Sequence, residues 1–135
     1  MYQTILVAMA ITLANSAGLA AGDATEGCCE AGSPFVLGEA FPENPATCQN
    51  IEHWASRAPQ IDTRVSMTIT GELTVVDSDG MLAYLVMCEE DQMRVLCVTY
   101  STEGREVGEE VLLAGGYAGG DDRMVVLDPC LASAP

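Results

Sequence analysis

The sequence contains no lysine and only one histidine, His53, among its 135 residues. Its five cationic side chains are all arginines, and twenty aspartates and glutamates oppose them, so the formal net charge is -15 at pH 7. Nucleic-acid binding depends largely on cationic contacts to phosphates, and anionic membranes attract basic segments. We therefore expect neither nucleic acid nor an anionic membrane as a partner. The acidity is typical of a well-solvated surface, as in a salty habitat, and also suits a basic partner.

The motifs of common catalytic sites are also missing. The sequence has no Gly-x-Ser-x-Gly, no P-loop, no His-Glu-x-x-His and no Cys-x-x-Cys. One histidine and no lysine leave few side chains to act as nucleophile or base. We therefore predict that the protein is not an enzyme and has no catalytic residues and no cofactor.

Residues that bind metals are present, but their spacing matches no common metal site. His53 stands near Cys48 and follows Cys28 and Cys29, yet these intervals match no zinc or copper motif. Residues 77–80, Asp-Ser-Asp-Gly, resemble the start of a calcium loop whose later acidic ligands are absent. We predict no metal site, and a hairpin turn at 77–80.

The first 20 residues carry no charged side chain. A mostly apolar stretch at 5–13 is followed by small residues, which is typical of a secretory signal peptide. The stretch is shorter than the roughly 20 residues that a membrane span requires. We therefore predict a signal peptide at 1–20, cleavage between Asn15 and Asp23, and a periplasmic or secreted protein that is not inserted in the membrane.

An extended N-terminal arm is predicted at 21–44, which is rich in Gly, Pro and Glu. A helix is predicted next, because Asn44 suits an N-cap and Pro45 the first helical position. Its apolar stripe has the helical spacing and consists of Ile51, Trp54, Ala55 and Ala58. Pro59 is expected to end the helix.

A long strand is predicted at 65–76, where apolar and polar residues alternate. Gly71 interrupts the apolar series, and a strand glycine often marks a bend or a bulge. A long strand bent at this point can serve both halves of a closed barrel. Apolar segments predict four further strands, at 82–88, 93–100, 111–117 and 123–127.

Five strands with a glycine-bent first strand resemble the oligonucleotide/oligosaccharide-binding fold, the OB-fold. Residues 107–115, Val-Gly-Glu-Glu-Val-Leu-Leu-Ala-Gly, look like the entry into the fourth strand of many OB domains. The resemblance covers about 65–128, and the helix before the first strand is similar to small secreted bacterial OB-fold proteins. It implies a mainly β domain at 45–131, a five-stranded OB-like barrel with one preceding α-helix.

An even number of cysteines in an exported chain predicts disulfides. A hairpin register that pairs Glu90 with Val95 would place Cys88 opposite Cys97 on one face. We therefore predict a disulfide between these two cysteines.

A second disulfide between Cys48 and Cys130 would fasten the helix to the end of the barrel. These two pairings would leave Cys28 and Cys29, which could stay free, bind a metal or join another chain.

The OB-fold hosts many unrelated binders, so we expect a non-catalytic binding module whose ligand is an unidentified protein or small molecule. Its ligand face would be the second and third strands with the turns at 77–80 and 118–122. Stacking surfaces would come from three tyrosines: Tyr84, Tyr100 and Tyr117. One alternative is a disulfide-stapled structural or assembly subunit that docks on a basic partner protein. The other is a metal or thiol-redox carrier that uses Cys28 and Cys29.

Overall fold

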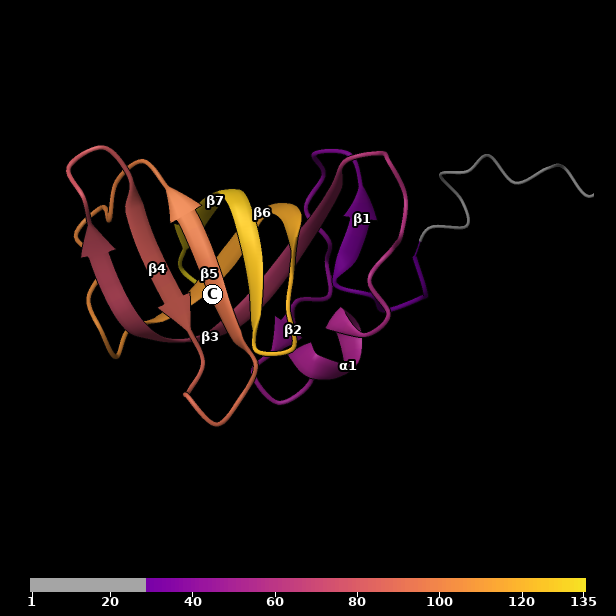
Figure 1. Ribbon diagram of the computed structural model, residues 1–135, viewed down its shortest axis with the longest axis horizontal. Helices are drawn as coiled ribbons and strands as arrows, with labels where there is room; N and C mark the ends of the chain where they lie inside the picture. Colours follow the sequence, from indigo (N-terminus) through magenta and orange to yellow (C-terminus); the bar gives the residue numbers. More distant parts are fainter. Residues whose placement is uncertain (1–28) are drawn as a thin grey trace, which may run out of the picture.

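Five strands of the protein close into a barrel in the computed structural model, which describes residues 29–135 (Figure 1). The elements are β1 (Phe35–Leu37), β2 (Ala46–Thr47), α1 (Ile51–Ala55), β3 (Val65–Ser78), β4 (Ala83–Met87), β5 (Arg94–Thr99), β6 (Glu110–Gly120) and β7 (Met124–Ser133). The ring runs β3-β4-β5-β7-β6 and closes through pairing of β6 with β3. Only β5 and β7 are parallel neighbours in it. This mainly β, closed five-stranded barrel confirms the predicted fold class and is compatible with an OB-like fold.

β3 is shared by the two halves of the barrel. Residues 66–72 pair with β6, and residues 73–78 pair with β4. Gly71 lies next to this change of partner, where a Cβ atom would come within 2.9 Å of both Cys48 Sγ and Met87 Sδ. No larger residue fits at this position unless one of these neighbours moves.

The alternation predicted along β3 holds only as far as Leu73. The register shifts by one residue between Leu73, which faces Met87, and Val75, which faces Val86. A bulge of this kind turns every later side chain to the opposite face. Val75 is consequently 38% exposed, whereas Val76 packs against the core. The alternation predicted for 65–76 places Val75 in the same apolar series as Leu73, and this expectation was wrong.

The first half of β3 is enclosed by residues 33–42, of which β1 pairs with its edge and the residues after β1 cover its outer side. Ser66 and Thr68 are buried although they lie opposite the core-facing side chains of β3. The Ser66 hydroxyl donates to the Gly38 carbonyl at 2.5 Å, and the Thr68 hydroxyl donates to the Pro42 carbonyl at 3.4 Å. We call this region the covered wall. It incorporates part of the predicted N-terminal arm into the fold.

α1 lies beside β2 at one end of the barrel (Figure 1). Ile51 is fully buried, Ala58 joins the core, and Trp54 and Ala55 pack against it. The predicted apolar stripe therefore faces the core.

The predicted start of this helix was wrong. Ala46 and Thr47 form β2, which pairs in parallel with β3, and the residue before the helix is Asn50 rather than Asn44. The Asn50 side chain accepts a hydrogen bond from the Thr47 N–H at 2.7 Å. Pairing with β3 thus outweighs the local preference for a helix start at Asn44 and Pro45.

The two disulfides among the described residues are Cys48–Cys88 and Cys97–Cys130. The predicted pairings of Cys88 with Cys97 and of Cys48 with Cys130 were therefore wrong. Met87, not Glu90, pairs with Val95, so the residue opposite Cys97 is Leu85.

Cys88 lies just beyond the end of β4, where it meets Cys48 before α1. Cys97 points into the core and meets Cys130 of β7. Cys29 is also disulfide-bonded, and none of the described cysteines is free. Cys28 lies outside the described residues.

Candidate binding face

The outer side of β4 and β5 carries apolar side chains in register with each other. Alternate residues of the two strands, such as Leu85 and Cys97, face the core. The residues between them face outward, and a row of them crosses four strands, from Val75 through Val86 and Leu96 to Val126. Tyr84 and Val98 form a neighbouring pair on the same side. We call these six residues the open face.

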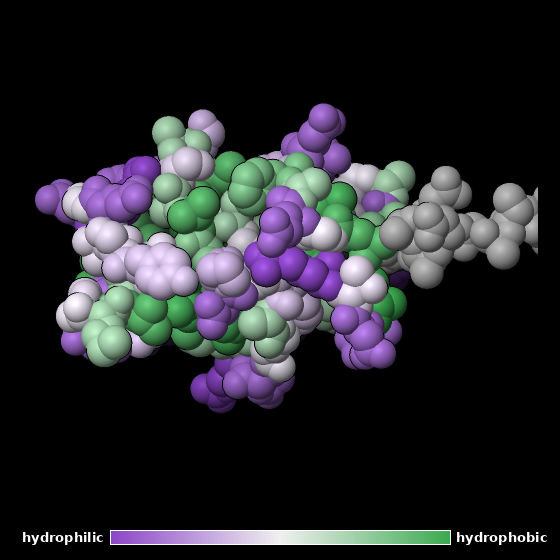
Figure 2. Space-filling view, turned by 90° about the horizontal axis from the view of Figure 1, so that it is seen from above, coloured by the Kyte–Doolittle hydropathy of each residue, from purple (hydrophilic) through white to green (hydrophobic). Residues whose placement is uncertain are grey.

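The open face is separate from the core of the barrel. Val86 is only 7% exposed, yet it does not belong to the cluster of core residues. Its cover therefore comes from its neighbours on the outer side of the sheet. β4 lies at the opposite end of the molecule from β1 (Figure 1), and Figure 2 shows apolar patches between hydrophilic side chains on the surface of the molecule.

One end of the open face is the turn between β3 and β4. One Asp79 carboxylate oxygen accepts the N–H groups of Met81 and Leu82 at 2.9 and 2.8 Å, and the other accepts the Tyr84 hydroxyl at 2.8 Å. Hydrogen bonds from these backbone groups and then from Tyr84 lower the pKa of Asp79, and the same carboxylate raises the pKa of Tyr84. Asp79 thus organises a turn, as predicted for 77–80, and fixes the Tyr84 hydroxyl beside it.

Exposed apolar side chains continue beyond this turn. Met81 is 84% exposed, and Tyr100, directly after β5, is 79% exposed. Both lie at the end of the sheet where Ala83 pairs with Thr99. Large apolar groups that remain this open are available for contact with another molecule.

The other end of the open face is a hollow of about 640 Å³. Its lining consists of Glu52, Glu90, Asp91, Gln92, Met93, Arg94, Asp122, Arg123 and Met124. We call it the acidic hollow. The Arg94 guanidinium donates to Thr74 Oγ1 at 2.9 Å and to the Cys88 carbonyl at 3.3 Å, so it is turned toward β3. The ion pairs found within 29–135 involve none of the four carboxylates of the hollow.

Asp121 has a different role beside the acidic hollow. Its carboxylate accepts the N–H groups of Arg123 and Met124, both at 2.8 Å, and these bonds lower the pKa of Asp121. It therefore shapes the turn between β6 and β7, as Asp79 does at the opposite end.

The predicted ligand face is only partly the one that the structure presents. Tyr84 lies on it and Tyr100 at its end, but Tyr117 does not belong to it. The Tyr117 ring meets Phe35 edge-on at 5.3 Å, and burial raises the pKa of Tyr117. Val75 and Val126 were not predicted as members, although outward-facing positions of β7 could have been found from the alternation around Val125 and Leu127.

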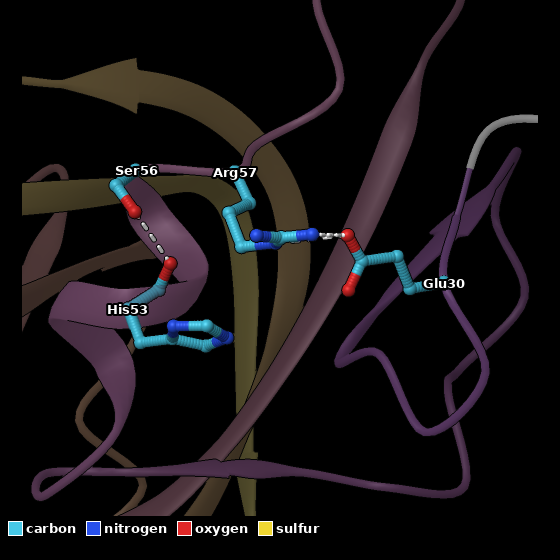
Figure 3. A network of polar contacts seen from close by, with 4 residues as sticks. All are labelled: Glu30, His53, Ser56 and Arg57. Atoms are coloured by element: carbon cyan, nitrogen blue, oxygen red, sulfur yellow. Dashed lines mark hydrogen bonds and ion pairs between the residues drawn. The ribbon is translucent and has the colours of Figure 1, made fainter.

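His53 lies on α1, away from other metal-binding side chains. Its ring stacks edge-on against Trp54 at 5.1 Å, and its carbonyl accepts the Ser56 hydroxyl at 2.7 Å. The neighbouring Arg57 pairs with Glu30 of the N-terminal segment (Figure 3). Within the described part of the chain, no group of three or more His, Cys, Asp or Glu side chains could hold a metal ion.

No family model matches the chain, and no curated protein matches it. In the part of the chain that the structure describes, no helix is both long and apolar enough to cross a membrane.

Proposed function

We propose that this chain is an exported, non-catalytic binding module of OB-like fold that docks a partner protein through its open face. The row from Val75 through Val86 and Leu96 to Val126 is the observation that carries this proposal. It lies outside the core, and contiguous apolar surface of this kind marks interaction sites. A binding module and a disulfide-stapled assembly subunit would both use this surface. They would differ only in how long the partner protein stays bound.

Export to the periplasm or to the cell exterior is supported by two features of the chain. The uncharged residues 1–20 are typical of a signal peptide. The disulfides Cys48–Cys88 and Cys97–Cys130 suit an oxidising compartment.

The absence of catalysis is supported by the surroundings of the single histidine. The Ser56 hydroxyl donates to the backbone carbonyl of His53 and not to its imidazole, so the two do not form a nucleophile–base pair. Nucleic acid is a poor partner because carboxylates frame the open face at both ends. A metal carrier gains no support at Cys29, since its sulfur is disulfide-bonded and is not a thiolate ligand.

Site-specific photo-crosslinking in the native host tests the proposal. A benzophenone amino acid replaces Val98 on the open face or, as the matched control, Leu131, which is 60% exposed on β7 where that strand pairs with β6. We expect one discrete protein adduct from position 98 and none from 131, and we expect Leu96→Asp to abolish it.

Mass spectrometry identifies the adduct, and circular dichroism confirms that each variant folds. Leu96→Asn replaces Leu96→Asp if the aspartate variant unfolds. Absence of an adduct at position 98, or the same adduct at both positions, would contradict the proposal.

A further inference from the structure

We infer that the partner presents apolar side chains followed by a lysine or arginine, and that this cation enters the acidic hollow. The inference rests on the proposed function of the open face. The inference adds the chemistry of the partner's binding segment and the direction in which that segment lies on the sheet.

The acidic hollow directly continues the open face. Arg94 pairs with Met124 in the same parallel ladder in which Leu96 pairs with Val126. Two residues along a strand span roughly 6.6 Å, which is also the spacing of alternate side chains on a bound extended segment. A segment whose apolar residue covers Leu96 can therefore place its next outward side chain over the Arg94–Met124 pair.

The electrostatics of the hollow favour a cation. Four carboxylates line it, those of Glu52, Glu90, Asp91 and Asp122, and they outnumber the two lining guanidiniums of Arg94 and Arg123. The Arg94 guanidinium is turned toward Thr74 of β3. None of the four acids has an ion-pair partner within residues 29–135. The formal charge of -15 also speeds the encounter with a basic partner.

The apolar part of the lining favours a long cationic side chain over a small hydrated ion. Met93 and Met124 lie in the hollow beside the acids. Lysine and arginine pack their methylene stems on apolar surface while the charged head remains among polar groups, and the thioethers adapt to that stem. A second copy of this chain also has a formal charge of -15, so it would bring like charges together.

Fluorescence anisotropy with two labelled peptides tests the inference on the full chain. Both peptides alternate leucine and serine, and one ends in two lysines where the other has two glutamines. We expect the lysine peptide to bind about three- to tenfold more tightly at low salt, since each exposed ion pair contributes only modestly. Salt should reduce that difference.

The hollow variant combines Glu90→Gln, Asp91→Asn and Asp122→Asn, and it should bind the two peptides equally. The matched control removes three exposed acids elsewhere, with Glu43→Gln, Glu103→Gln and Glu106→Gln, and should keep the preference for lysine. Loss of the preference in both variants would assign it to net charge rather than to the hollow, and would overturn the inference.

The remaining outcomes separate the inference from the proposed function. Equal binding of both peptides to the wild-type chain, abolished by Leu96→Asp, overturns the lysine inference and leaves the open face as a binding site. No binding of either peptide contradicts both. Leu96-dependent dimerisation in analytical ultracentrifugation would assign the open face to a second copy and overturn the inference.

Discussion

The covered wall and the open face reverse the usual distribution of polar and apolar residues. Ser66 and Thr68 are 2% and 1% exposed beneath residues 33–42, whereas Val75 on the open face is 38% exposed. Each buried hydroxyl donates to a carbonyl of the covering segment. The covered wall can therefore be polar because its hydrogen bonds are satisfied internally.

The open face has no comparable covering segment among residues 29–135, and its exposure ranges from 38% at Val75 to 7% at Val86, which its neighbours on the sheet enclose. Its residues add nothing to the core cluster, yet five of the six are aliphatic, and these five lie on four adjacent strands. The polarity of the side chains therefore does not show which side of a strand is buried. Burial depends on whether another segment covers that side. One wall has its partner within the chain, and the other is suited to a partner from outside.

The two disulfides fasten different parts of the fold, and removing them should give the largest effects. Cys48–Cys88 fastens the segment before α1 to the end of β4, and Cys97–Cys130 joins β5 to β7 behind the open face. Each double alanine variant should lose about 2–4 kcal/mol of unfolding free energy, measured by urea titration.

Hydrogen exchange should distinguish the two disulfide variants. Cys48→Ala with Cys88→Ala should increase exchange in β1, β2 and α1, whereas Cys97→Ala with Cys130→Ala should increase it in β5 and β7. The same exchange pattern in both variants would show that the two regions are one cooperative unit. Peptide mapping without reduction should recover the two observed pairings.

Gly71→Val should have the next largest effect, because it adds a side chain at the junction of the two regions. The new Cβ would collide with the Cys48–Cys88 disulfide and with Met87, so we expect a loss of about 1–3 kcal/mol. Thr70→Val is the control and should change stability little. Equal and small effects of both variants in urea titrations would show that the neighbours of Gly71 yield easily.

The sequence predicts the barrel well because its strands follow local periodicity. The alternation up to Leu73, the break at Gly71 and the apolar segments that became β4 to β7 all depend on neighbouring residues. β7 nevertheless runs to Ser133, beyond its predicted end at 127, since its pairing with β6 extends from Val125 to Ser133, past the residues that pair with β5.

The errors share a dependence on register and on distant partners. The bulge after Leu73 reverses the faces of β3, and the hairpin that pairs Met87 with Val95 separates Cys88 from Cys97. β2 forms because β3 lies beside it. The candidate site likewise has a part that local pattern predicts and a part that depends on distant contacts. Outward positions on β4 and β5 were predictable, but the acidic hollow unites three separate segments of the chain.

Two opposite substitutions, one on the covered wall and one on the open face, should have smaller effects on stability. Together they test the comparison of the two regions directly. Thr68→Val removes a buried hydroxyl donor to the Pro42 carbonyl on the covered wall, so we expect a loss of about 1 kcal/mol. Val98→Thr places a hydroxyl on the open face, where water can reach it, and should cost about 0.5 kcal/mol or less. If Val98→Thr lowered the stability more than Thr68→Val in thermal and urea unfolding, the open face would have to be covered in solution.

The smallest effect concerns the Asp79–Tyr84 hydrogen bond at the end of the open face. The bond raises the pKa of Tyr84 above its ordinary 10.0, so Asp79→Asn should lower it, as measured by absorbance titration of the tyrosines. Asp77→Asn removes a weaker charge effect on Tyr84 and should lower its pKa less. Equal shifts in the two variants would indicate that charge, rather than the hydrogen bond, controls Tyr84.

The same bond fixes the direction of the pH dependence at this turn. Because the folded protein lowers the pKa of Asp79 below its ordinary 3.8, the stabilisation by its carboxylate is present above 3.8 and is lost as the pH falls through the lowered value. The raised pKa of Tyr84 acts in the other direction, so its stabilisation is present below 10.0 and is lost as the pH rises through the raised value. The turn should therefore be most ordered between these limits, with amide exchange of Met81 and Leu82 as the measurement. Asp79→Asn should remove the acid dependence and weaken the alkaline one, since burial and Asp77 also raise the pKa of Tyr84.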